Sequence, residues 1–255
     1  MTQTLAEKFG FEVRADVAKM LLDSVPAVPT NVSPDKRASM LRSRQSNHTV
    51  AALDYYLLGM LAETRKVAVQ IPAITLDWLF GSWRTEFVSE SGEKGHEALR
   101  ASMSWMGGFE GSLLWGATLG EWEFLEKIAE YPSEDADIGY EGFDETDRLV
   151  FLAISSLLLN DQNRLSRYLN DLNENGGERS KHVAAVLDGM SQRDVARLND
   201  ALGKYLQYFK KREFPKRNIF RKVSVLGTFV YHYGHHLGLA VHVEPEFMDH
   251  IVRLS

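Results

Sequence analysis

Cysteine is absent from the 255 residues of this chain. Its absence excludes disulfide bonds, zinc sites built on cysteine and a thiol nucleophile. A chain without cysteine is also compatible with a reducing compartment, so we expect a cytoplasmic protein.

Long apolar runs are missing as well. The longest weakly polar stretch, residues 101–120, contains Glu110 and several glycines, and it falls short of the roughly 20 apolar residues that a membrane-spanning helix needs. The first ten residues carry charges where a secretion signal would need an apolar stretch. We therefore expect neither a membrane span nor a secretion signal.

The chain has no excess of positive charge. Its formal net charge is −6, which argues against a general nucleic-acid binder and is compatible with a basic protein partner. Hydrophobic residues make up 44% and charged residues 25% of the chain, so a sizeable core is available and wholesale disorder is disfavoured.

Helical periodicity is clearest between Leu149 and Phe209. An apolar run from Leu149 to Leu159 is interrupted by Asn160-Asp161, and apolar residues then recur three and four apart. The same pattern restarts after Gly177 and breaks again at Ser191. Residues at this spacing share one face of a helix, so each segment has one side to bury against a neighbour.

Three acidic residues near expected helix starts can be placed in register. Glu121, Asp161 and Asp194 lie 40 and 33 residues apart, in the range of helical-hairpin repeats. Leucine follows four residues after each acid, and a small or apolar residue follows after eight, at Leu125, Leu165, Leu198, Ala129, Leu169 and Leu202. We predict an all-α fold of stacked helical hairpins, a degenerate repeat of the α-solenoid type with about ten to twelve helices. We expect one domain over residues 1–255, with an N-terminal helical subdomain 1–90 and a hairpin-repeat part 91–255.

Other helices are predicted from periodicity and start signals. The glycines of residues 97–118 are interpreted as sites of close helix–helix approach rather than as a phosphate-binding loop. The expected helices are 5–25, then Pro34 to about Val69 with a break near Gln45–His48, Leu76–Val88 capped by Thr75, 97–118, 122–131, 217–236 and a short one from Pro245 to Leu254.

A histidine array lies near the C-terminus. His232 and His236 are four residues apart, a spacing that zinc ligands use on a helix, and His235 lies between them. Tyr233 stands where the His-Glu-x-x-His motif of metalloproteases has its glutamate. We favour structural histidines at the end of a helix and keep a metal site as the alternative.

Acidic residues are concentrated between Glu130 and Asp147, a stretch with eight acids and no base. Such a run is either a solvated segment or a docking strip for a cationic partner, which it would attract electrostatically. The candidate partner-binding residues are Glu130, Glu134, Asp135, Asp137, Glu141, Asp144, Glu145 and Asp147.

A basic cluster follows the long helix that ends near residue 211. We interpret it as cations gathered at a helix C-terminus, where the helix dipole favours them, ahead of a site for nucleic-acid phosphates. Its members are Lys210, Lys211, Arg212, Lys216, Arg217, Arg221 and Lys222.

The layout of residues 152–254 resembles a known family. The features that carry the likeness are the Leu157-Leu-Leu-Asn-Asp161 break, the Val186-Leu-Asp-Gly-Met190 hairpin with Asp194, the helix Leu198–Lys211, the Gly234-x-x-x-Gly-Leu239 segment and the tail from Pro245 to Leu254. In these features the chain is similar to the helical immunity proteins of bacterial polymorphic-toxin systems, in particular to the family numbered forty-nine among them.

This resemblance implies a non-enzymatic, cytoplasmic bacterial protein that binds a cognate toxin and blocks it, with no catalytic residues and no cofactor. The acidic strip, together with the concave face of the hairpin stack, would then be the contact surface for a basic effector such as a nuclease. Two alternatives stay open: a helical-repeat scaffold or regulatory protein that binds a peptide or subunit, and a metal-dependent enzyme that uses the histidine array. Self-association into a homo-oligomer also stays open.

Overall fold

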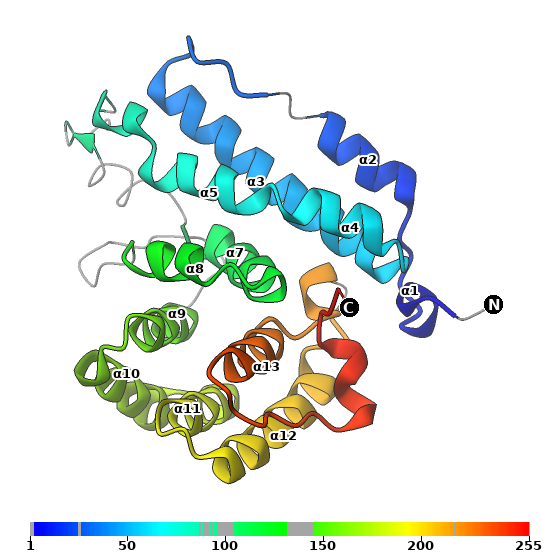
Figure 1. Cartoon of the computed structure of the whole chain (residues 1–255), viewed down its shortest axis with the longest axis vertical. Helices are drawn as coiled ribbons and strands as arrows, with labels where there is room; N and C mark the ends of the chain where they lie inside the picture. Colours follow the sequence, from blue (N-terminus) through cyan, green and yellow to red (C-terminus); the bar gives the residue numbers. More distant parts are fainter. Residues whose placement is uncertain are drawn as a thin grey trace. The chain divides into compact units, whose positions relative to one another are not determined.

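The computed structural model describes residues 3–24, 27–86, 88, 92, 94–95, 105–131, 145–216 and 218–254, without the side chains of 105–107 and 145. Within these residues the chain forms twelve α-helices and three 3-10 helices, and no β-strand beyond an isolated bridge between Val88 and Lys94 (Figure 1). The expected all-α fold is confirmed. None of the described helices is both long and apolar enough to cross a lipid bilayer.

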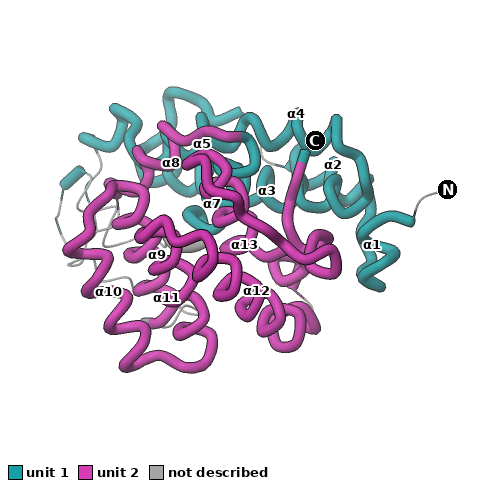
Figure 2. Tube along the Cα trace, turned by 60° about the horizontal axis from the view of Figure 1, so that its bottom comes forward, with its two compact units in different colours: residues 1–119, 133–140, 254 teal, residues 120–132, 141–253, 255 magenta. Residues whose placement is uncertain are grey.

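The chain divides into two compact units, coloured separately in Figure 2. Unit 1 comprises Met1–Leu119 with Ser133–Tyr140 and Leu254, and unit 2 comprises Gly120–Pro132 and Glu141–Arg253 with Ser255. The single domain expected from the sequence, with its subdomain 1–90, stays a prediction.

Unit 1 is built around one long helix, α3. The second half of α3 is buried almost all round, from Ala51 to Leu57, because other helices of the unit pack along it. The elements of unit 1 are α1 (Leu5–Lys8), α2 (Ala15–Asp23), α3 (Pro34–Leu57), α4 (Leu61–Ala68), α5 (Ile71–Phe80), the 3-10 helix η1 (Ser82–Glu86) and α7 (Trp105–Leu119).

Glycines let α7 approach its neighbours closely in unit 1. A Cβ atom on Gly108 would lie 2.3 Å from the ring of Trp78 on α5, and one on Gly111 would lie 2.7 Å from the side chain of Thr49 on α3. Close approach therefore accounts for these two glycines, as predicted. Beside them, the buried Gln45 amide donates a hydrogen bond to the carbonyl of Gly108 over 3.0 Å.

Unit 2 is the stack of helical hairpins that the sequence predicts. Each helix from α9 to α12 packs against the helix that precedes it in the chain, and α11 also contacts α9. The elements are α8 (Trp122–Ala129), α9 (Glu145–Leu158), α10 (Gln162–Asn175), α11 (Glu178–Ser191), α12 (Val195–Arg212), the 3-10 helix η2 (Ile219–Arg221), α13 (Val225–His236) and the 3-10 helix η3 (Pro245–His250).

The three acids that the sequence places in register, Glu121, Asp161 and Asp194, each follow the same kind of turn. Gly120, Asn160 and Arg193 have positive φ angles of 76°, 54° and 52°, and the acid after each is the N-cap of the next helix. The Asp161 and Asp194 carboxylates accept hydrogen bonds from the amides of Arg164 (3.0 Å) and Arg197 (3.1 Å), whereas Glu121 makes no such side-chain cap. The leucines four residues after each acid are buried.

A fourth copy of this turn lies in unit 1 and is not predicted from the sequence. Gly59 has a φ of 75°, and Met60 is the N-cap of α4 with a ψ of 66°, close to the 65° of Glu121. The amide of Met60 bonds to the carbonyl of Tyr55, as Asp161 does to Ser156 and Asp194 to Gly189. Without an acid at the cap, the sequence carries no signal for this copy.

Two expected helix boundaries in unit 1 are wrong because glycines end helices where periodicity continues. The predicted helix 5–25 is split into α1 and α2 by Gly10, whose φ is 58°. Conversely, α3 runs unbroken through Gln45–His48, and the break falls at Gly59 instead.

Two other helices begin elsewhere than predicted. Helix α5 starts at Ile71 with a proline in its first turn, so Thr75 lies inside the helix, buried, with its hydroxyl 3.1 Å from that of Ser112. Helix α13 starts at Val225 after a Ser224 cap, not at Arg217. The final element is a 3-10 helix that ends at His250, short of Leu254, and the start of the predicted helix 97–118 lies outside the described residues.

Candidate functional site

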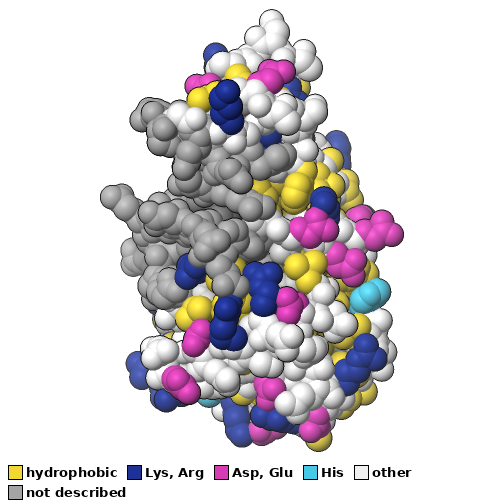
Figure 3. Space-filling model, turned by 90° about the vertical axis from the view of Figure 1, so that its left-hand side faces the viewer, with side chains coloured by type: hydrophobic (Ala, Val, Ile, Leu, Met, Phe, Trp, Pro, Cys, Tyr) yellow, Lys and Arg dark blue, Asp and Glu magenta, His cyan; other side chains and the backbone are white. Residues whose placement is uncertain are grey.

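The predicted acidic strip is described only at its two ends. Glu134, Asp135, Asp137, Glu141 and Asp144 lie outside the described residues, and Glu145 opens α9 without a described side chain. Glu130 follows α8 and pairs with Lys127, with about half of each side chain exposed. On the face drawn in Figure 3, acidic and basic side chains of the described residues are interspersed.

Asp147, the last acid of the strip, is held by an arginine. It pairs with Arg179 of α11, and only 16% of the Asp147 side chain and 27% of the Arg179 side chain is exposed. Burial by itself would lower the pKa of the Arg179 guanidinium, but the charge and hydrogen bond of Asp147, together with Tyr205 and Glu213, outweigh burial, so the pKa is raised. This ion pair fixes the first turn of α9 to the first turn of α11.

A buried acid, Glu213, lies among part of the basic cluster. Its carboxylate lies 2.9 Å from Nζ of Lys216 and 3.4 Å from Nε of Arg221. The ammonium of Lys222, a buried residue, donates to the carbonyls of Phe214 (2.9 Å) and Lys216 (3.0 Å).

The rest of the cluster agrees with the helix-end interpretation. Lys210, Lys211 and Arg212 form the last turn of α12, and Lys210 pairs with Glu246 over 2.9 Å. Arg217 lies outside the described residues. Most of the described cations are therefore engaged with their own chain, which leaves little free charge here for phosphates.

The histidine array is dispersed into separate packing contacts. Nε2 of His232 donates to the carbonyl of Val252 over 2.8 Å, and burial lowers the pKa of this histidine. His236 stacks on Trp122 with ring centres 4.6 Å apart, and His235 meets the Tyr231 ring edge-on at the same distance. The described residues contain no group of three or more side chains placed to hold a metal ion.

Two histidines that follow the array in the chain, His242 and His250, also make contacts within unit 2. The buried His250 has Nδ1 3.3 Å from the carbonyl of Lys222, and the exposed His242 has Nε2 3.4 Å from the carboxylate of Glu244.

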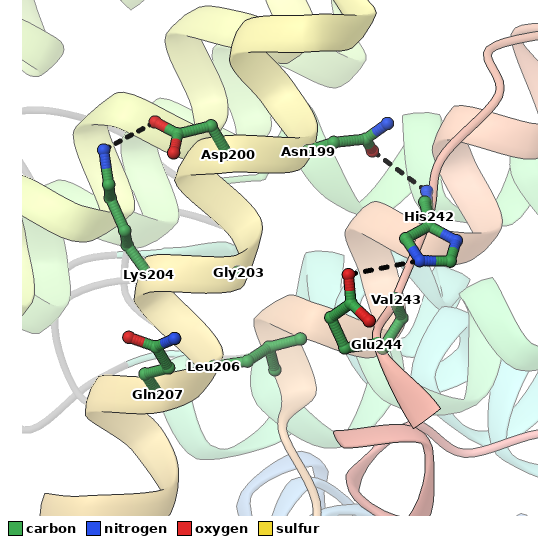
Figure 4. A pocket seen from close by; sticks show the side chains of 9 residues that line it. All are labelled: Asn199, Asp200, Gly203, Lys204, Leu206, Gln207, His242, Val243 and Glu244. Atoms are coloured by element: carbon green, nitrogen blue, oxygen red, sulfur yellow. Dashed lines mark hydrogen bonds and ion pairs between the residues drawn. The ribbon is translucent and has the colours of Figure 1, made fainter. Parts of the chain in front are cut away.

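A groove that the sequence did not predict runs along α12. It encloses about 460 Å³ between α12 and the segment that follows α13 (Figure 4). Asn199, Gly203 and Gln207, spaced by four residues, share the helix face that forms one wall. The other lining residues are Asp200, Lys204, Leu206, His242, Val243 and Glu244.

The far wall of the groove is an extended segment held by Asn199. The side-chain amide of Asn199 donates to the carbonyl of Ala240 (3.1 Å), and its oxygen accepts from the amide of His242 (2.9 Å). Side chains alternate along this segment as in a strand: Val241 and Val243 are buried, while Ala240, His242 and Glu244 are exposed.

Comparisons of the chain with models of protein families, with curated proteins and with solved structures gave no match.

Proposed function

We propose that this chain is an immunity protein that binds a cognate bacterial toxin and neutralises it by protein–protein contact. The layout of residues 152–254 supports the proposal, because it resembles such proteins and lies within a hairpin stack. Stacked helical hairpins offer broad surfaces that suit the binding of another macromolecule.

The observation that carries the proposal is the acidic strip and the way its ends are placed. The strip has eight acids and no base, and it joins α8 to α9, two helices that pack together in unit 2. The two ends of the strip, Glu130 and Asp147, therefore lie at one pair of packed helices. A strip of one sign of charge speeds the encounter with a partner of the opposite sign. A basic effector such as a nuclease, which must bind phosphates, is the partner that this charge fits.

The gene next to the one that encodes this chain provides the test of the proposed immunity function. We expect its product to be toxic when expressed alone in a bacterial host and harmless when this chain is expressed with it. A neighbouring product that is harmless, or whose toxicity this chain does not relieve, would contradict the proposal.

The strip itself is tested with purified proteins. The variant E134Q/D135N/D137N/E141Q should bind the toxin at least about tenfold more weakly, mostly through slower association. The matched control E12Q/D23N/E63Q/E174Q neutralises four acids elsewhere, all of them exposed, and should change affinity by less than about threefold. Equal losses in the two variants would show that net charge, not the strip, drives binding.

One observation favours the alternative of a peptide-binding scaffold, namely the groove beside α12. A neighbouring gene unrelated to any toxin, together with binding of a cellular protein through this groove, would support that alternative. Metal analysis of the purified chain tests the other alternative, a metal-dependent enzyme that uses the histidine array.

A further inference from the structure

The groove beside α12 contains a vacant position in a hydrogen-bond ladder. In an extended segment, the carbonyl of one residue and the amide two residues later point to the same side. Asn199 takes such a pair, the carbonyl of Ala240 and the amide of His242. The next pair on the same side is the carbonyl of His242 and the amide of Glu244. Neither group has a hydrogen-bond partner within the described part of the chain.

Gly203 lies on α12 beside this vacant pair. A Cβ atom on Gly203 would meet nothing within 4 Å, and its backbone is not left-handed, so neither packing nor conformation requires glycine here. Glycine inside a helix costs about 1 kcal/mol relative to alanine. The absence of a side chain instead leaves the groove open between Asn199 and Gln207, four residues away on either side.

We propose that this groove binds a short extended segment of a partner protein. A backbone amide of that segment donates to the carbonyl of His242, its carbonyl accepts from the amide of Glu244, and its chain passes over Gly203. Binding of this kind adds a strand to exposed backbone groups. The volume of about 460 Å³ lies within the range of pockets that hold small ligands, so a few residues fill it.

The charges of the groove favour a basic segment over an acidic one. The lining contains two carboxylates, Asp200 and Glu244, and one lysine, Lys204, which pairs with Asp200 over 2.6 Å. The carboxylate of Glu244 pairs only with His242 among the described residues, so it is the group that a lysine or arginine of the bound segment would meet.

The probe for this proposal is the capped pentapeptide acetyl-TVKVT-amide, added to the isotope-labelled full chain and followed by amide NMR spectra. We expect shifts confined to Gly203 and to His242–Glu244. Methylation of the lysine backbone nitrogen removes the amide that donates to His242 and should weaken binding roughly tenfold. The acidic peptide acetyl-TVEVT-amide should bind more weakly than the basic one.

Two variants of α12 separate the groove from the rest of the helix. Gly203→Leu fills the groove with a residue of higher helix propensity, so it should abolish the shifts while the melting temperature does not fall. Lys211→Leu places the same side chain on an exposed position of α12 outside the groove and should leave binding unchanged.

Several results would overturn the proposal. These are no shifts with either peptide, shifts elsewhere on the chain, or equal binding by the N-methylated peptide or by the Gly203→Leu variant. Shifts of the same amides on dilution without peptide would show that a second copy of the chain occupies the groove. Equal binding of the acidic peptide would remove the preference for a basic segment. The probe contains no toxin, so these outcomes are independent of the proposed immunity function.

Discussion

The Cα atom of Leu198 lies where a side chain on Gly189 would have to go. A Cβ atom on Gly189 would be 2.9 Å from the Cα atom of Leu198 and 3.0 Å from its backbone nitrogen. Helices α11 and α12 thus touch through backbone, and no flexible side chain can move aside.

Gly189→Ala should therefore destabilise the protein by about 1–3 kcal/mol, because the two helices must separate. Chemical denaturation checks this value. The matched control is Gly203→Ala on α12, where the new methyl group meets nothing. That control should stabilise the protein by about 0.5–1 kcal/mol. A neutral Gly189→Ala variant would mean that α11 and α12 do not approach so closely.

The aspartates at the recurring turn should each stabilise the helix that they begin. Asp161→Ala and Asp194→Ala each remove a carboxylate that accepts a backbone amide, and each should cost about 0.5–2 kcal/mol in unfolding free energy. Glu121→Ala removes an acid at the same position without a side-chain cap and should cost less. Similar losses in all three variants would assign the effect to charge near the helix dipole rather than to the cap.

Asp54 makes the stability of the protein depend on pH. It is 7% exposed on α3, and burial raises the pKa of its carboxyl to about 6 from a usual 3.8. The folded state therefore holds the proton more tightly than the unfolded state. The stability linked to Asp54 is present below pH 4 and is lost as the pH rises through about 6.

Asp54→Asn keeps the shape and removes the charge. It should leave stability unchanged near pH 4 and raise it above pH 6 by up to about 3 kcal/mol. Unfolding curves measured across this range, with the exposed Asp23→Asn as control, give the comparison. A stability difference that does not vary with pH would show that Asp54 is ionised in the folded protein at no cost.

The ion pair of Asp147 and Arg179 should couple α9 to α11. Arg179→Met leaves a mostly buried carboxylate without its partner and should cost about 2–4 kcal/mol, and Asp147→Asn should cost a similar amount. The double variant should cost less than the sum of the two single changes. Strict additivity in this double-mutant cycle would mean that the two charges do not interact.

The hairpin stack was predictable because its signals are local. Leu165, Leu169 and the aspartate cap before them lie within one helix and its turn, so spacing alone identifies the buried face. Helix breaks were less predictable, since periodicity continues past Gly10 and Gly59, and only the backbone angle at each glycine decides where the helix ends.

No local sequence pattern predicts the groove beside α12. Asn199 bonds to Ala240 and His242, about forty residues further along the chain, so the two walls meet only through tertiary packing. From the sequence alone, Gly203 is a residue that destabilises a helix. Its role in keeping the groove open is recognised only from the empty space beside it. The acidic strip was visible in composition, but composition did not reveal that Asp147 is engaged by Arg179.

The turns at Gly59, Gly120, Asn160 and Arg193 join helices whose lengths range from 8 to 24 residues. Because each turn keeps its backbone geometry whatever the length of the helices on either side, the fold can be extended. Whole helical turns can be inserted or deleted within a helix, and the turn that we call a joint does not change. Homologues of this chain should therefore differ in length by steps of three or four residues inside helices, with each joint retained.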